Sequence, residues 1–82
     1  MKNKVLIKLI VPDIDETYDI FLPINKKIGE IVILVIKSIN EHESLNLPNN
    51  KVLYNRNTGK DYDPNDLIKN TDIRNGTSLI LL

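Results

Sequence analysis

An uninterrupted run of six apolar residues, from Ile31 to Ile36, constrains the fold of this chain more than any other feature. By periodicity alone, such a run suits a buried strand as well as a buried helix. The segment that contains it, residues 26–43, is too long for one strand and lies between two clearer strand pairs. The sequence therefore predicts a helix, against which most of the core packs.

The predicted helix has one apolar side and one charged side. At about 100° per residue, its apolar residues form a broad stripe with the charges opposite. The stripe comprises Ile28, Ile31, Val32, Val35 and Ile39, and the opposite side carries Glu30, Lys37 and Glu41. Ile33 and Leu34 fall outside the stripe, on either side of the charges, and form a second candidate contact patch. Single apolar residues are also common on surfaces that bind nothing.

The length of 82 residues predicts one domain, residues 1–82, whose core is limited by the high surface-to-volume ratio of a small protein. The absence of cysteine excludes disulfides, a thiolate nucleophile and a cysteine-based zinc site. Eleven basic and eleven acidic residues cancel, so the overall charge suggests neither nucleic acid nor an anionic membrane as a partner. We therefore expect protein partners.

Residues 1–13 combine lysines with apolar residues, as signal peptides do. Lys8 interrupts the apolar run, Pro12 and Asp13 end it, and no small-residue cleavage site follows. No apolar stretch approaches the roughly 20 residues that a membrane-spanning helix requires. The expected location is the cytoplasm, without membrane insertion.

Alternating apolar residues predict an N-terminal hairpin of two strands, residues 4–11 and 17–22, joined by turn-forming residues. The positions expected to face the core are Val5, Ile7, Leu9 and Val11 in the first strand and Tyr18, Ile20 and Leu22 in the second. Asn25 lies where its side chain can cap the helix that follows.

After the helix, a short third strand is predicted at residues 51–54 and a last strand at residues 77–82, which follows the turn pair Asn75-Gly76. Residues 60–70 favour turns, with one helical turn around Leu67 and Ile68. A hairpin partner and a crossover helix separate the two terminal strands, which most simply lie side by side in a mixed sheet beneath the helix. The predicted fold is therefore an α+β β-grasp.

The order and spacing of these segments resemble ubiquitin over nearly the whole chain. The matching stretches are the first strand KVLIKLIV, the proline in FLPINKKI, the apolar helix and the ending LIKNTDIRNGTSLILL. Ubiquitin and its conjugated relatives carry a flexible Gly-Gly tail, because only glycine threads into the narrow sites of the activating enzymes. Leu82 falls where the last ubiquitin strand is still in the sheet, so conjugation is not expected unless the native product extends to such a tail.

Within that superfamily, the chain resembles the small bacterial proteins of the YukD and EsaB type, which are encoded with type VII (WXG100, ESX-like) secretion systems. The resemblance rests on the length, the TYD and LP stretches within residues 17–36, the leucine-rich ending SLILL and a composition that suits a Gram-positive bacterium. It departs from the family pattern at residues 61–70. It implies a non-conjugated, cytoplasmic accessory or regulatory protein that binds cytoplasmic domains of the secretion machinery.

Alternation also predicts which apolar residues lie on the sheet face turned away from the helix, where ubiquitin-like domains commonly bind partners. These candidate partner-binding residues are Leu6, Ile10, Phe21, Ile80, Leu82 and one of Leu53 or Tyr54, with Tyr54 as the choice. A contiguous apolar patch of a few hundred Å² often marks a binding surface. One-sided sheets also leave some apolar residues uncovered without any partner.

Reactive side chains are sparse, so no catalytic, cofactor or metal site is expected. His42, the only histidine, lies at the polar end of the helix and is interpreted as solvated. The aspartates within residues 61–66 lack the glycine and terminal glutamate of a calcium loop, and residues 57–60 lack the surroundings of a P-loop. No nucleophile, base and oxyanion donor can be combined, which argues against an enzyme.

Two alternatives to the secretion module remain open. A sulfur carrier or protein modifier requires a longer gene product that ends in Gly-Gly. A self-associating scaffold buries Phe21, or Ile33 and Leu34, between two copies; otherwise we expect a monomer or a weak dimer.

Overall fold

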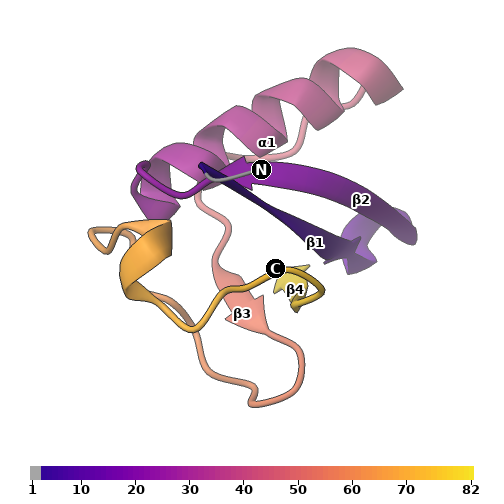
Figure 1. Ribbon diagram of the computed structural model, residues 1–82. Coiled ribbons are helices and arrows are strands. Elements are labelled where there is room, and N and C mark those ends of the chain that lie inside the picture. The colour runs from indigo at the N-terminus through magenta and orange to yellow at the C-terminus, as the bar shows by residue number, and fades with distance from the viewer. Residues whose placement is uncertain (1–2) are drawn as a thin grey trace.

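The structure is a computed structural model that describes residues 3–82, so residues 1 and 2 of the predicted domain lie outside the described residues. Its elements, in chain order, are β1 (Lys4–Val11), β2 (Glu16–Pro23), α1 (Ile28–Glu43), β3 (Leu53–Asn55) and β4 (Ser78–Leu81). Short 3-10 helices occupy Pro12–Ile14 and Ile68–Asn70. The helix α1 lies across one face of a single mixed sheet (Figure 1), which confirms the predicted β-grasp arrangement.

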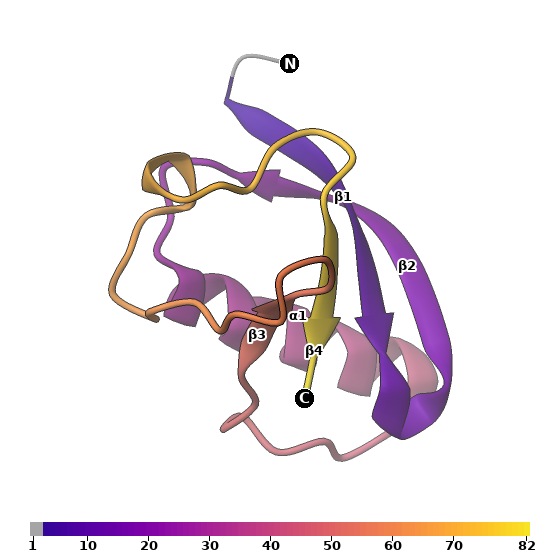
Figure 2. The same cartoon turned by 90° about the horizontal axis from the view of Figure 1, so that it is seen from below.

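The first and last strands of the described chain lie side by side at the centre of the sheet, whose strand order is β2-β1-β4-β3 (Figure 2). β1 pairs antiparallel with β2 and parallel with β4, while β3 pairs antiparallel with β4. The backbone N–H of Lys8 donates to the carbonyl of Thr77 at 3.0 Å, next to the parallel pair of Lys8 and Ser78. The predicted central pairing of the first and last strands is therefore confirmed.

The core lies between the sheet and α1, where the predicted inward positions of the strands are buried. Fully buried strand residues are Ile7, Leu9, Val11, Leu22, Leu53, Leu79 and Leu81, with Val5, Tyr18 and Ile20 packed against them. Each fully buried side chain of this size stabilises the fold by roughly 1.5–3 kcal/mol relative to an exposed one. Alternation in the sequence was enough to identify this side of the sheet.

The apolar stripe of α1 differs from the predicted one at two neighbouring positions. Ile36 is fully buried although the stripe omitted it, and Val35 is only half-buried. Segments outside the helix lie on that side: Leu47 packs against the core and exchanges hydrogen bonds with Asn40, one turn after Ile36. At the start of the helix, the loop at Pro64 lies so close to Gly29 that an added Cβ would come within 3.1 Å of the proline side chain. The helix is therefore enclosed on its Ile36 side as well as from below.

The same loop provides the cap of α1, so the predicted cap by Asn25 is wrong. The helix begins at Ile28 after Lys27, which makes no side-chain cap. Instead, the backbone N–H groups of Ile28 and Gly29 donate to the carbonyls of Asp66 and Pro64, each at 2.9 Å. A neighbouring backbone segment thus satisfies donors that the first turn leaves unpaired.

The bounds of β3 also differ from the prediction, which placed the strand at residues 51–54. The strand runs from Leu53 to Asn55, because the Asn55 side chain organises the turn that follows. Its Oδ1 accepts the backbone N–H of Asn57 at 2.8 Å, and the residue is buried. The predicted helical turn near Ile68 is confirmed, whereas the buried Ile73 was not identified from the sequence.

Within residues 3–82, α1 and the two 3-10 helices all lack the length and apolarity that a bilayer-spanning helix requires.

Candidate interaction surfaces

The sheet face away from α1 carries all six predicted partner-binding residues. Leu53 is buried in the core, so the alternative left open in the third strand resolves to Tyr54. Leu6, Phe21 and Leu82 are 41%, 50% and 51% exposed, and Ile10, Tyr54 and Ile80 are partly exposed. Whether this face binds a partner stays a prediction, but its apolar residues are accessible.

The strand register places three of these residues in one row across the sheet. Ile10 of β1 lies opposite Ile80 of β4, which lies opposite Tyr54 of β3. Leu82 pairs with Val52 through two backbone hydrogen bonds of 2.8 and 2.9 Å, and Val52 is 37% exposed. We call these five residues, Ile10, Val52, Tyr54, Ile80 and Leu82, the major patch. The sequence prediction left Val52 out, although it lies two residues before Tyr54 and so shares a face with it in an extended segment.

The remaining two predicted residues form a separate minor patch. Leu6 lies opposite Phe21, while the turn at Asn75 and Gly76 closes beside them. The Asn75 side-chain oxygen accepts the N–H of Leu6, and the N–H of Gly76 donates to the Leu6 carbonyl, both at 2.8 Å. Gly76 has φ +89°, which suits glycine and confirms the predicted turn.

A polar row separates the two patches. Lys8 of β1 lies between Asp19 of β2 and Ser78 of β4 in the ladder, one row from Ile10 and one row from Leu6 on the same face. The predicted surface is therefore two apolar areas divided by charged and hydroxyl groups. Only the register, which the sequence pattern does not give, shows this division.

The second predicted patch, Ile33 and Leu34, lies on the solvent side of α1. The two side chains are 51% and 55% exposed. As neighbours in the helix they project about 100° apart. Ile33 follows Gly29 by one turn, on the side of the Pro64 loop, and Leu34 precedes Ser38 by one turn, on the side of β2.

Polar contacts at the far edge of the sheet hold β3 in place beneath the major patch. The Tyr62 hydroxyl donates to Asp72 Oδ1 at 2.6 Å and accepts from Asn55 Nδ2 at 3.0 Å. Burial, followed by the hydrogen bond to the Asp72 carboxylate, raises the pKa of Tyr62 to about 12. The N–H of Tyr62 also donates to the Leu53 carbonyl at 3.0 Å, so residues 60–62 cover the outer edge of β3.

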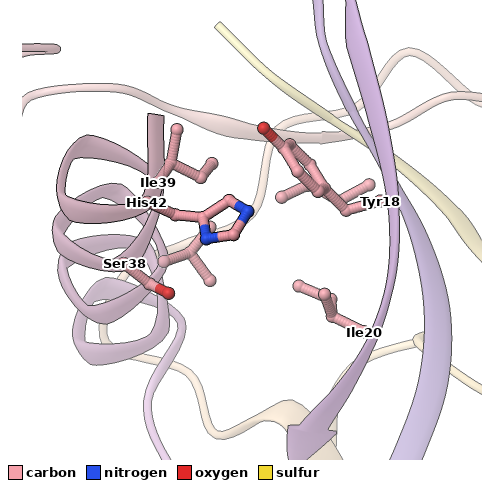
Figure 3. A pocket seen from close by; sticks show the side chains of 7 residues that line it. Tyr18, Ile20, Ser38, Ile39 and His42 are labelled. Carbon is pink, nitrogen blue, oxygen red and sulfur yellow. The ribbon is translucent and has the colours of Figure 1, made fainter. Parts of the chain in front are cut away.

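An open cavity of about 210 Å³, which the sequence did not predict, lies between β2 and α1. Figure 3 shows Tyr18 and Ile20 of β2 facing Ser38, Ile39 and His42 of α1 across it. Its floor is Leu9 and its helix wall includes Val35. One sequence feature could have indicated this cavity. Ser38 has a short side chain and lies one turn from both Val35 and His42, on the side of α1 that faces an edge strand.

Acidic groups surround the Tyr18 end of this cavity. The Tyr18 hydroxyl lies 3.5 Å from Glu43 Oε1, as its hydrogen-bond donor. Burial, followed by the negative charges of Glu43 and Glu16, raises the pKa of the Tyr18 hydroxyl above its usual value. His42 lines the cavity and is exposed, as expected for a solvated residue.

The segments that the sequence analysis compared with a calcium loop and a P-loop form ordinary turns. Asp63 Oδ1 accepts the N–H of Asn65 at 2.9 Å, which is a local turn contact, and Gly59 has φ +72° in the turn after β3. Among residues 3–82, no three histidine or acidic side chains converge as they would to hold a metal ion.

No protein-family model and no curated protein matches the chain. Among solved structures, a chain of the MycP5-free ESX-5 inner membrane complex is similar, with a TM-score of 0.80 and 12% identity over 98% of this chain and 21% of that chain. A chain of the toluene 4-monooxygenase complex with the inhibitor 4-bromobenzoate has a TM-score of 0.78 and 4% identity over 95% of each chain. The ubiquitin of Caldiarchaeum subterraneum has a TM-score of 0.70 and 12% identity over 95% of this chain and 90% of that chain.

These similarities show that the chain has the ubiquitin-like β-grasp fold, as the sequence predicts. At such low identities the similarity concerns the fold alone. The same fold occurs here in an ESX-5 inner membrane complex, a toluene 4-monooxygenase complex and a ubiquitin, so the fold by itself does not select a function. The finer resemblance to YukD and EsaB proteins stays a prediction.

Proposed function

We propose that this chain is a non-conjugated ubiquitin-like binding module that serves a bacterial type VII secretion system from the cytoplasm. Its role is accessory or regulatory, and it docks through the major patch onto a cytoplasmic domain of the secretion machinery. Binding rather than catalysis is the activity that its accessible features suit.

The similarity to a chain of the ESX-5 inner membrane complex supports this proposal most directly. A region making up 21% of that chain has the same fold as 98% of this one, with a TM-score of 0.80. A module of this shape therefore occurs within a component of such a complex. The TYD, LP and SLILL stretches point to the same class of secretion system.

The choice of the major patch rests on its apolar content and its continuity. Ile10, Ile80 and Tyr54 adjoin one another across three strands, and Leu82 extends the area at the end of β4. Partner interfaces usually have an apolar centre with aromatic residues and a polar rim. Here Tyr54 supplies the aromatic ring, and the row of Lys8 and Ser78 borders the patch on one side.

A binding experiment with single charged substitutions tests the proposal. The probe is the purified cytoplasmic domain of a type VII secretion membrane component from the same host, titrated against the wild-type chain, Ile80→Lys, Leu82→Lys and Leu6→Lys. We expect Ile80→Lys and Leu82→Lys to weaken binding at least tenfold, because each would bury an unpaired charge in the apolar area that the partner covers. Leu6→Lys, in the minor patch, should have a smaller effect.

The control is Asn65→Lys, which adds the same charge to an exposed loop on the helix side of the molecule. Circular dichroism should show all variants folded. Equal binding by the wild-type chain and Ile80→Lys would overturn the proposed docking face. Native protein that carries a Gly-Gly end and covalent adducts, seen by intact mass spectrometry, would instead favour a modifier, and a concentration-dependent dimer in light scattering would favour a scaffold.

A further inference from the structure

We propose that the minor patch, Leu6 and Phe21, together with the polar groups around it, binds a short acidic segment of another protein. The segment inserts an aromatic side chain beside Phe21 and places its flanking carboxylates on Lys4 and Lys8. This site is independent of the proposed docking surface, because the row of Lys8 separates the minor patch from the major patch.

The first observation is that the minor patch is concave. An open hollow of about 440 Å³ lies over it, with Leu6 and Phe21 among the lining residues. The turn at Asn75 and Gly76 borders this hollow and runs beside the start of β1 (Figure 2). A concave site accepts a protruding side chain, whereas the flat surface of a bilayer would leave the hollow unfilled.

The second observation is the half-exposed ring of Phe21, which indicates the kind of side chain that fits. Phe21 lies directly opposite Leu6 in the antiparallel pair, so the two form one apolar floor. A second aromatic ring that packs against Phe21 gains stabilisation beyond the burial of its area. Lys4 and Lys8 lie two residues before and after Leu6 on the same face, and cations are also attracted to the face of an aromatic ring.

The third observation is the charge of the outer face, which is positive although the whole chain is balanced. Lys4 and Lys8 both line the hollow. Arg56 adjoins the same polar row, since its backbone N–H donates to the Ser78 carbonyl at 3.0 Å. Asp19 is the one acidic residue that the four strands place on this face. A basic ligand is therefore repelled, and an acidic one is attracted.

The two lysines of the hollow are not neutralised by the chain itself. The described residues 3–82 contain an ion pair between Lys51 and Asp13, away from the hollow, and none at Lys4 or Lys8. Lys4 lies opposite Pro23, which carries no charge. The carboxylates of a bound segment can therefore supply the missing counter-charges.

Uncharged hydrogen-bond donors lie in the same hollow. Oδ1 of Asn75 accepts the N–H of Leu6 at 2.8 Å, which leaves the two Nδ2 hydrogens of that amide to donate. The Ser78 hydroxyl also lines the hollow. Ammonium, amide and hydroxyl groups all donate to carboxylates, and such bonds are stronger than those between neutral groups. The site thus combines an apolar floor with donors for an anion.

Three pentapeptides, capped at both ends, separate these requirements. The acidic aromatic probe is DEFED, the acidic probe without a ring is DESED, and the basic aromatic probe is KRFRK. In NMR titrations of the wild-type chain at low ionic strength, we expect DEFED to bind at least tenfold more tightly than either of the others. The amide signals of Leu6, Phe21 and Gly76 should shift, while those of Leu82 in the major patch and Ile39 in the β2–α1 cavity should stay unchanged.

A pair of alanine variants tests the aromatic contact. Phe21→Ala removes the ring and should weaken DEFED binding at least fivefold. Leu34→Ala truncates a side chain of similar exposure on α1 and should leave the affinity unchanged.

A pair of double variants tests the charges. Lys4→Gln combined with Lys8→Gln should weaken DEFED binding about fivefold, because each exposed charge pair contributes little. Lys37→Gln combined with Lys69→Gln removes the same charge from exposed positions outside the hollow and should have a much smaller effect.

Four outcomes would overturn the proposal. The first is binding of KRFRK or DESED as tight as that of DEFED, and the second is a DEFED titration that shifts Leu82 or Ile39 instead of Leu6 and Phe21. The third is a shift at Leu6 and Phe21 that depends on protein concentration without any probe, which would assign the hollow to a second copy of this chain. The fourth is binding to phosphatidylglycerol vesicles without any response to DEFED, which would assign it to a bilayer. The wild-type titrations decide even if a variant fails to fold.

Discussion

The two faces of the sheet are built from the same strands, and their comparison separates residues that make the fold from residues that are available to a partner. On the inner face, Leu79 and Leu81 are 0% and 1% exposed under α1. On the outer face, their neighbours Ile80 and Leu82 remain accessible. Both faces are rich in leucine and isoleucine, so hydrophobicity alone does not distinguish them. The difference is that the inner face has a layer packed against it.

The largest expected effect is on the inner face. Leu81→Asp places a carboxylate where no partner can reach it, and we expect a loss of at least about 4 kcal/mol, enough to unfold a domain of this size. Leu82→Asp, one residue later, should change the free energy of unfolding by only about 0.5 kcal/mol because its side chain is half exposed. Urea denaturation followed by circular dichroism measures both. Similar losses in the two variants would mean that the faces are not distinct.

A second comparison lies within α1, between Ile36 and Ile33. Ile36→Ala removes a fully buried side chain and should cost about 3 kcal/mol, the usual range for such a truncation being roughly 2–5 kcal/mol. Ile33→Ala removes a side chain that is half exposed and should cost less than about 1 kcal/mol. The measurement is again the free energy of unfolding in urea. A small loss for Ile36→Ala would mean that this side of the helix is not tightly enclosed.

Ile36 also shows which features of the structure the sequence pattern does not predict. The order of the strands, the central pairing and the inward residues of β1 and β2 follow from alternation and connection rules, which act locally or on whole segments. The burial of Ile36 depends on chain outside the helix, since Leu47 packs against the core and is hydrogen-bonded to Asn40, one turn after Ile36. Helical periodicity carries no information about such a segment, so the predicted stripe stopped short.

The sequence pattern likewise predicted only part of the candidate surfaces. Alternation identified all six outer-face residues, because it reports which face each side chain takes. It did not show that the row of Lys8 divides them, because that depends on how β1, β2 and β4 are aligned. The cavity at Tyr18 and Ser38 was also missed, since it arises from two elements that lie apart in the sequence.

The two edges of the sheet provide the next comparison, because β3 is covered and β2 is not. Tyr62→Phe keeps the ring but removes the hydroxyl that joins Asp72 and Asn55 at the covered edge. We expect a loss of about 1.5–2 kcal/mol at neutral pH, the low end of the range of about 1.5–3 kcal/mol for a hydrogen bond to a charged acceptor, because Tyr62 is only partly buried. Chemical denaturation measures it. A loss near zero would mean that this contact does not stabilise the β3 edge.

The pKa of Tyr62 adds a pH dependence to this prediction. Its value of about 12 in the folded chain lies above the ordinary value of 10.0, so the folded state holds the phenolic proton more strongly. The resulting stabilisation is fully present below pH 10 and is lost as the pH rises toward 12. The wild-type chain should therefore lose more stability than Tyr62→Phe over this interval. Parallel losses in the two proteins would contradict the raised pKa.

The smallest expected change in the free energy of unfolding comes from a substitution of Lys8, in the polar row that divides the outer face. Lys8→Leu should change the free energy of unfolding by only about 0.5 kcal/mol, because the side chain is exposed. It would, however, join the major and minor patches into one apolar surface. Larger contiguous apolar patches on soluble proteins promote association, so we expect sedimentation velocity to show self-association of Lys8→Leu at concentrations where the wild-type chain is monomeric.

Lys69→Leu, which removes an exposed lysine in the 3-10 helix instead, is the matched control. If both variants stay monomeric, the division of the outer face by Lys8 is not what limits association.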